Sequence, residues 1–219
     1  MLLETTKTTP TGQTPNPVFA QLASDESIRC AVEALRDHGI EAFVVANTAE
    51  AWAKLEELIP AGAEVFTSSS TTFIQTGLQA EIDREGGRYH SVRVQLGKMD
   101  PKTQNREMQK LGATPEYVVG SVHAVTETGS VLVASASGSQ LAPYAAAAAH
   151  VVWVVGAQKI VPTLETALQR LEEYTFQLED QRAMKVYGMH SGINKLLVIN
   201  KEGNPQRTKM IIVKENLGF

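Results

Sequence analysis

The chain alternates short, almost continuous apolar runs with longer segments in which apolar residues recur every three or four positions. The apolar runs at residues 40–46, 63–66 and 150–155 are rich in valine, alanine and aromatic residues. Strands without a polar face are typical of parallel sheets that are covered on both sides, and the helical period of the intervening segments supplies that cover. The pattern therefore predicts an α/β, Rossmann-like fold: a mostly parallel sheet with helices on both faces.

Capping and helix-breaking residues bound the predicted helices. Ser24 precedes the first helix and Gly39 ends it, while Asn47 precedes the second helix and Pro60 stops it. Pro162 opens the clearest helical pattern of the chain, which continues for about four turns.

Five further segments carry strand-forming sequence. Residues 89–96 alternate polar and apolar side chains, which predicts a strand with one solvent-facing side. The β-rich runs at residues 117–125 and 130–135 flank a turn and predict a small antiparallel excursion from the parallel sheet. Residues 195–200 and 209–214 resemble a closing pair of strands.

The first residues differ in composition from the rest of the chain. Residues 4–17 contain many threonines and prolines and no apolar period, so residues 1–20 are expected to form a flexible leader. No linker or internal repeat interrupts the remaining sequence. With 219 residues in all, residues 21–219 are expected to form a single domain.

Composition limits the partners and the compartment. The net charge is −4 and aromatic residues make up 6% of the chain, which disfavours a nucleic-acid-binding surface, since such surfaces gather Lys, Arg and stacking rings. No apolar stretch reaches the roughly 20 residues that cross a membrane, and the first residues lack the pattern of a secretion signal. A cytoplasmic protein without nucleic-acid or membrane partners is expected.

The single cysteine, Cys30, excludes an internal disulfide and any iron–sulfur cluster or zinc site built only from cysteines of this chain. The five histidines show neither HxH nor HxxxH spacing, so a metal site has little support in the sequence. His123 lies in an apolar run, where a hydrogen-bonded core histidine is the simpler interpretation. No cofactor is indicated by these residues.

Three loops that follow predicted strands are candidate ligand sites, because ligands of open α/β sheets bind beyond the carboxyl ends of the strands. The first loop, residues 67–72, has six hydroxyl residues in a row and includes Ser69, Ser70, Thr71 and Thr72. Such hydroxyls suit a phosphate or a carboxylate. The alternative is that one of them caps the next helix, as in a Thr72-x-x-Gln75 capping box, and that the others face water.

The second loop, residues 135–143, contains Ser137 and Gly138, and its small side chains let backbone amides approach a ligand. The alternative is a polar connector in which the glycine only permits a turn. The third loop places Lys159 after the apolar run at residues 150–155. The alternative for this lysine is a solvated surface side chain.

Glu127 stands in a glycine-punctuated turn within an otherwise almost uncharged stretch, residues 117–140. A desolvated carboxylate in that position could act as a base or a nucleophile. The alternative is a turn glutamate that points into water.

Residues 118–130 read VVGSVHAVTETGS, and in this segment the chain resembles the lactate-utilisation (LUD) domain family, which has a core of the form VG..HAV(T/A)ETG. It is also similar to that family in a small-residue loop leading to a proline, in an HVVWVV-like strand followed by Lys-Ile-Val, and in a Glu-x-Leu-Gly-Phe segment. Here these features are residues 135–143, 150–161 and 215–219. The resemblance covers about residues 24–219.

The resemblance implies a fold related to the sugar-phosphate isomerase and CoA-transferase-like group. It also implies a role in the oxidation of lactate to pyruvate beside partner proteins that carry iron–sulfur centres. Because this chain cannot hold an all-cysteine cluster, the redox centres would lie on those partner chains. CoA-transferase-like relatives carry a nucleophilic glutamate in a Glu-x-Gly turn, and Glu127 stands in a turn of this form, although a shared fold does not fix a function.

Three functions are open at this point. The first is a soluble component of lactate utilisation with a pocket for a small anionic ligand such as a carboxylate, a phosphate or a CoA ester. The second is an acyl or CoA transferase, or a sugar-phosphate isomerase, that uses Glu127 as its catalytic residue. The third is an assembly module whose strands within residues 195–214 pair with a partner. A homodimer is compatible with the fold, and no residue demonstrates one. The residues expected to edge the pocket are Ser69, Ser70, Thr71, Glu127, Ser137 and Lys159.

Overall fold

The computed structural model describes residues 14–219. Most of the expected leader, residues 1–13, lies outside the described residues. In the described part of that segment, Pro17–Ala20 forms a short helical turn, η1. The Asn16 side chain accepts a hydrogen bond that caps this turn, and the Asn16 backbone N–H donates to the Glu173 carbonyl at 2.9 Å. These contacts fasten residues 16–20 to the domain.

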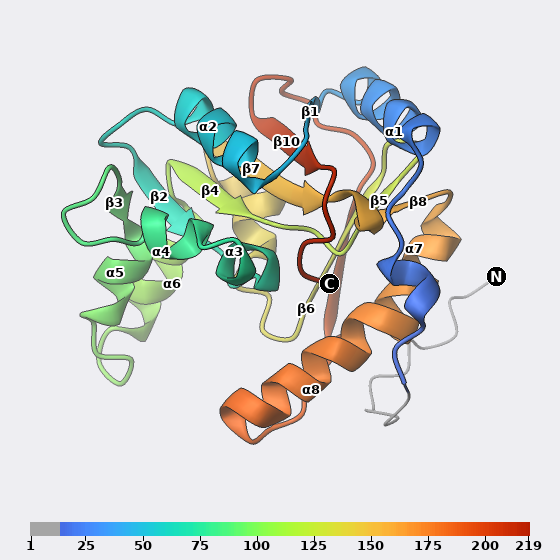
Figure 1. Ribbon diagram of the computed structural model, residues 1–219. Coiled ribbons are helices and arrows are strands. Elements are labelled where there is room, and N and C mark those ends of the chain that lie inside the picture. The colour runs from blue at the N-terminus through green and yellow to red at the C-terminus, as the bar shows by residue number, and fades with distance from the viewer. Residues whose placement is uncertain (1–13) are drawn as a thin grey trace.

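The predicted parallel sheet is confirmed. Six strands form an all-parallel sheet in the order β1-β10-β7-β4-β2-β3 (Figure 1). The strands are β1 Glu41–Val45, β2 Glu64–Thr67, β3 His90–Ser91, β4 Tyr117–Gly120, β7 His150–Gly156 and β10 Thr208–Val213.

The antiparallel excursion is also confirmed, and it belongs to a second sheet with the order β8-β5-β6-β9. Its strands are β5 Ala124–Thr126, β6 Val131–Ser135, β8 Ile160–Val161 and β9 Lys195–Ile199. β6 pairs antiparallel with both β5 and β9. The expected closing pair is therefore wrong: β9 is an edge strand of the small sheet, whereas β10 lies between β1 and β7 in the large one.

The first two helices begin at the predicted caps. The Ser24 hydroxyl accepts from the Ser27 N–H, and the Asn47 side chain accepts from the Glu50 N–H. The helix that Pro162 was expected to open begins at Leu164, with Thr163 as its capping residue. The helices are α1 Asp25–Asp37, α2 Thr48–Leu58, α3 Thr71–Gln75, α4 Leu78–Ile82, α5 Val92–Gly97, α6 Asn105–Ala113, α7 Leu164–Arg170 and α8 Phe176–Tyr187, with the short turns η2 Pro143–Ala147, η3 Ala157–Lys159 and η4 Leu171–Thr175.

Two local predictions are wrong. The alternating segment at residues 89–96 forms only the two-residue strand β3 and then turns into α5, because the Ser91 hydroxyl accepts from the Val94 N–H and caps a helix there. The capping box at Thr72 and Gln75 does not form. Ser70 precedes α3 without a side-chain cap, and the Gln75 side chain instead accepts from the Gly218 N–H at 2.8 Å.

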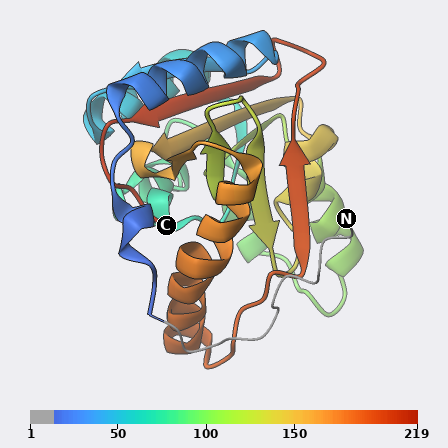
Figure 2. The same cartoon turned by 90° about the vertical axis from the view of Figure 1, so that its right-hand side faces the viewer.

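Alternate residues of the central strands enter different cores. In β7, Val151, Trp153 and Val155 face one core, whereas Val152 and Val154 face another. The first core lies between the large sheet, α1, α5 and the β5–β6 hairpin, and the second lies beneath α2, α3 and α4. A third core lies between the outer face of the small sheet and the chain from α7 to α8. The result is a layered molecule, in which α7 and α8 flank the small sheet (Figure 2).

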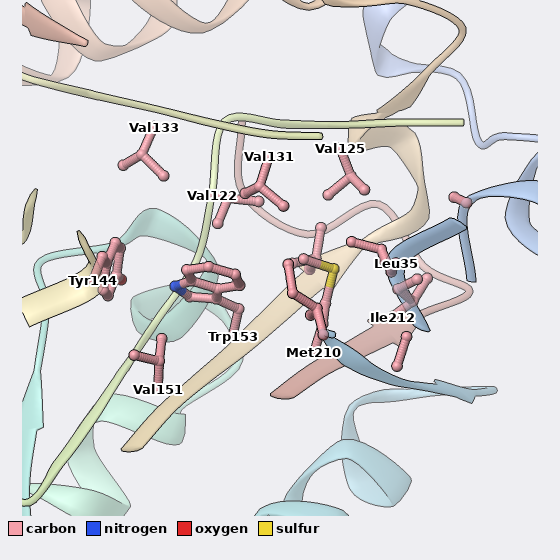
Figure 3. Close-up of a cluster of buried hydrophobic side chains, with 14 of the residues drawn as sticks. Leu35, Val122, Val125, Val131, Val133, Tyr144, Val151, Trp153, Met210 and Ile212 are labelled. Carbon is pink, nitrogen blue, oxygen red and sulfur yellow. The ribbon is translucent and has the colours of Figure 1, made fainter. Parts of the chain in front are cut away.

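Trp153 lies near the centre of the first core, below the valines of the β5–β6 hairpin, and Tyr144 lies to one side of it (Figure 3). Their rings meet edge to face at 5.4 Å. The Tyr144 hydroxyl hydrogen-bonds the Ser68 hydroxyl at 2.6 Å in the buried interior. Gly120, at the end of β4, leaves the space in which this pair of hydroxyls meets, because a Cβ there would overlap both oxygens.

We expect Gly120→Ala to lower the free energy of unfolding by about 1 to 3 kcal/mol, because the added methyl must displace the Ser68 and Tyr144 hydroxyls from a packed interior. Urea denaturation measures the change. Gly203→Ala is the matched control, since a Cβ at Gly203 meets nothing within 4 Å. Equal stability of the two variants would contradict the close packing around Gly120.

Candidate functional site

A cavity of about 510 Å³ lies where β2, β4 and β7 end at their carboxyl edges. These three strands are neighbours in the sheet. The chain after β2 contributes residues 68–71, the chain after β4 contributes residues 121–123, and the chain after β7 contributes Lys159. The end of β6 and the inner side of α8 form the opposite wall. The volume is within the range of small-molecule sites.

The hydroxyl loop after β2 has hydrogen-bonded side chains at its start and side chains without partners further along. The Thr67 hydroxyl donates to the Asp83 carboxylate at 2.7 Å, and the Ser68 hydroxyl pairs with Tyr144. Neither the Ser70 nor the Thr71 side chain has a hydrogen-bond partner within residues 14–219, and both line the cavity. These two hydroxyls are therefore free to bind a ligand.

Lys159 is buried, with 2% of its surface exposed, although it lines the cavity. Its Nζ donates to the Thr72 hydroxyl at 3.0 Å and to the Ser121 hydroxyl at 3.1 Å. No carboxylate of residues 14–219 lies within ion-pair distance of this nitrogen. Burial, with a smaller contribution from the Arg170 guanidinium, lowers the pKa of Lys159 well below its usual value.

His123 stands beside Lys159 in the cavity wall as a neutral ring. Its Nδ1 accepts the Ala134 N–H at 3.1 Å, which assigns the proton of the neutral ring to Nε2. Burial, together with the charges of Lys159 and Arg170, lowers the pKa of His123 to about 3. His123 therefore offers a hydrogen-bond donor and no charge at neutral pH. The expected hydrogen-bonded core histidine is confirmed in its contact, but the ring also lines the cavity.

Arg170 holds the chain behind His123. It is fully buried and donates from Nη1 to the His123 carbonyl at 2.5 Å and to the Thr175 hydroxyl at 2.8 Å. Burial lowers the pKa of Arg170 to about 10, so the guanidinium stays charged at neutral pH. The positive charge behind the wall adds to the anion-attracting character of the cavity.

Two further arginines reach the cavity. Arg93 donates to the Ser69 hydroxyl at 2.7 Å and lies 3.5 Å from the Asp83 carboxylate. Arg182 makes two 2.7 Å hydrogen bonds to Glu179 on α8. Glu179 is the only carboxylate side chain among the described residues that line the cavity. Arginine and lysine thus outnumber acidic side chains there, which favours an anionic ligand.

The loop after β6 contributes Ser137 to the cavity but not Gly138. The Gly138 N–H donates to the Ser135 hydroxyl at 2.8 Å, so this amide is used within the loop. Gly138 has a φ of +91° and faces the Lys195 side chain, which explains the glycine without a ligand.

Glu127 does not line the cavity. It follows the far end of β5, where its backbone N–H donates to the Val161 carbonyl at 2.9 Å. Four residues of extended chain separate it from His123, on the order of 13 Å. The neighbouring Gly129 packs against Ala34 and His38, at the end of α1. The structure therefore separates Glu127 from Ser69, Ser70, Thr71, Ser137 and Lys159, which it brings together.

Several cavity residues had no signal of their own in the sequence. Ser121 and His123 follow β4 at the sheet edge that also supplies the predicted loops, so the strand-end rule applied to β4 would have found them. Arg93 was hidden because its segment reads as a strand. Arg182 and Glu179 come from α8, whose position against the sheet is a tertiary feature.

The described residues contain neither a cluster of metal-ligating side chains nor a membrane-spanning helix. Within residues 14–219, no three His, Cys, Asp or Glu side chains gather so that they could hold a metal ion. No helix in the same range combines the length and apolar character needed to cross a membrane.

We expect the stability difference between Lys159→Met and the wild type to depend on pH. The folded wild type holds a neutral Lys159 above its lowered pKa, whereas the unfolded chain binds that proton up to about pH 10.4. Wild-type stability therefore rises with pH in this window, by at most about 1.36 kcal/mol per pH unit, and the methionine variant lacks this rise. Urea denaturation at about pH 7 to about pH 10 measures the difference.

Lys98→Met is the matched control, because Lys98 is exposed and paired with Glu85. Because Lys98→Met leaves the buried Lys159 amine in place, this variant should keep the wild-type rise in stability between about pH 7 and about pH 10. Parallel curves for Lys159→Met and the wild type would show that Lys159 stays protonated in the folded protein.

Comparisons with known proteins identify the family of this chain and a solved structure with a similar fold. The LUD domain family matches residues 28–213, which is most of the chain. The crystal structure of a DUF162 family protein from Deinococcus radiodurans at 1.70 Å resolution superposes with a TM-score of 0.52. It is 13% identical in sequence, and the match covers 88% of this chain and 99% of that one, so the likeness concerns the fold. No curated protein matches the chain.

The family match spans the strands β2, β4 and β7 and all three loops that bring hydroxyls and Lys159 to the cavity. It also includes residues 118–130, the VVGSVHAVTETGS segment. The chain belongs to the LUD domain family.

Proposed function

We propose that this protein is a cytoplasmic component of lactate utilisation that binds a small carboxylate in the cavity beyond β2, β4 and β7. The observation that carries the proposal is the buried Lys159 without a carboxylate partner, in a cavity lined by free hydroxyls. A carboxylate would accept from the hydroxyls of Ser70 and Thr71, which lack an acceptor, and from Lys159 when its nitrogen takes up a third proton. Membership of the LUD family supports the link to lactate.

In this proposal, partner chains carry out the redox step of lactate oxidation. The chain has one cysteine, so it supplies too few thiolates for an iron–sulfur cluster of its own. We therefore propose that iron–sulfur proteins of the pathway act beside this chain, which holds the lactate or pyruvate carboxylate. The unpaired cysteine is also consistent with the reducing cytoplasm.

The transferase or isomerase alternative depends on Glu127, and the geometry does not favour it. Glu127 lies at the other end of β5 from the cavity wall, beside the end of α1. Under the carboxylate-binding function, Glu127→Gln leaves the affinity for lactate or pyruvate unchanged. A loss of affinity or of acyl-transfer turnover of tenfold or more would favour the alternative.

We expect lactate or pyruvate to raise the melting temperature, because a ligand that binds only the folded state stabilises it. Inorganic phosphate and CoA esters test the other anionic ligands in the same experiment. Arg93→Gln should weaken carboxylate binding about tenfold, which corresponds to about 1.4 kcal/mol, since it removes a charge from the cavity wall. Isothermal titration calorimetry measures the affinity.

Arg84→Gln is the control for Arg93→Gln, because Arg84 is an exposed arginine nearby in sequence that does not line the cavity. It should bind as the wild type does. A wild-type protein that responds to none of the four ligand classes would contradict anion binding in the cavity.

Deleting the coding sequence tests the pathway rather than the site. We expect slow or absent growth with lactate as the carbon source and unchanged growth with pyruvate, since only the step before pyruvate is affected. A plasmid copy with wild-type sequence should restore growth. Normal growth of the deletion strain on lactate would contradict the role in lactate utilisation.

A further inference from the structure

The Lys159 amine has hydrogen-bond partners for two protons and none for a third. Its Nζ lies 3.0 Å from the Thr72 hydroxyl and 3.1 Å from the Ser121 hydroxyl. The Thr72 hydroxyl donates its own proton to the Leu217 carbonyl at 3.1 Å, so it accepts from Lys159. A neutral amine has two N–H groups and one lone pair, which matches these surroundings, whereas an ammonium would keep one N–H without a partner among residues 14–219.

The charges around Lys159 also favour the neutral amine. Two carboxylate side chains in or beside the cavity wall are engaged with other groups: Glu179 pairs with Arg182, and Asp83 accepts from Thr67 and Ser91. On the other side, the buried Arg170 guanidinium acts against a second positive charge, in the same direction as burial. No carboxylate of residues 14–219 lies within ion-pair distance of Lys159 to balance an ammonium.

Lys159 is a residue of the cavity wall, so the cavity is the space from which a ligand can reach its nitrogen. Lys159 is 2% exposed, and it lines the same space as the hydroxyls of Ser70 and Thr71. A lone pair on a neutral, desolvated lysine is the usual nucleophile of imine-forming proteins. A hydroxyl ligand such as lactate has no electrophilic carbon for it, whereas a 2-oxo acid carries a carbonyl next to its carboxylate.

We infer that Lys159 forms an imine with a small 2-oxo carboxylic acid, such as pyruvate, bound in this cavity. The inference rests on the proposed function, since it assigns the bound carboxylate a carbonyl group. It makes Lys159 a covalent attachment point for the oxidised form of the substrate and leaves the hydroxy acid to bind without a covalent bond.

The step balances without an oxidant or a reductant. The lone pair of Nζ attacks the carbonyl carbon, the carbonyl oxygen takes one amine proton, and a carbinolamine forms. Loss of this hydroxyl with the second amine proton gives the imine and one water. Ser121, whose hydroxyl lies 3.1 Å from Nζ, is placed to relay a proton between nitrogen and oxygen.

Trapping by reduction tests the inference on the full-length protein. Pyruvate and sodium cyanoborohydride should add one carboxyethyl group to the protein, and peptide mapping should find it on Lys159. Lactate with the same reductant should add nothing. Lys159→Met should lose this modification, and Lys98→Met, which removes an exposed lysine, should keep it. Circular dichroism confirms that both variants are folded, and mapping of the wild type decides the site even if one is not.

The outcomes separate this inference from the proposed function. A carboxyethyl group on Lys159 supports the imine. Pyruvate that raises the melting temperature but is never trapped on Lys159, or is trapped only on other lysines, overturns the imine and leaves carboxylate binding intact. Absence of both trapping and any thermal response to pyruvate, lactate or phosphate overturns both.

Discussion

A lysine amine buried at the edge of a parallel sheet is the constraint around which the candidate site is arranged. Removing an ammonium from water is costly unless a carboxylate accompanies it, and Lys159 has none within residues 14–219. Thr72 and Ser121 supply acceptors for its protons, and the Leu217 carbonyl orients the Thr72 hydroxyl. Thr72 was expected to bind the ligand, and its hydroxyl instead accepts a hydrogen bond from Lys159. Two hydrogen-bond positions of the Lys159 nitrogen are thus satisfied, and the third has no partner among residues 14–219.

The layered core explains why the chain can hold this amine in place. β7 carries Lys159 out of the sheet through η3, and both faces of β7 are buried against separate cores. The small sheet covers one face of the parallel sheet and, through the end of β6, provides the second wall of the cavity. α8 supplies further residues of that wall and packs beside the small sheet. The antiparallel excursion is therefore part of the site as well as part of the core.

The sequence could predict the fold class and most of the cavity rim, because both follow from local rules. Continuous apolar runs fix a parallel sheet, and the carboxyl ends of such strands meet at one edge, which brings Ser69, Ser70, Thr71 and Lys159 together. Glu127 is different: it follows a strand of the second sheet, and although the turn predicts an antiparallel excursion, nothing local indicates that β5 ends away from the cavity. Arg93 was missed because an alternating pattern does not reveal that Ser91 caps a helix. Buried pairs such as Ser68 with Tyr144 depend on residues 76 positions apart.

The protonation state of Lys159 couples the two ligand modes of the cavity. An anion that binds without a covalent bond is held best by an ammonium, so its binding raises the pKa of Lys159 and takes up a proton. A carbonyl compound needs the lone pair and is favoured by the neutral amine. Low pH therefore shifts the cavity toward simple carboxylate binding, and higher pH shifts it toward imine formation. Burial holds the pKa of His123 at about 3, so this ring is neutral near neutral pH and the lysine is the group of the pair that can change its charge. A hydroxy acid and its oxo acid, which differ by two electrons and two protons, would then be distinguished by the same nitrogen atom.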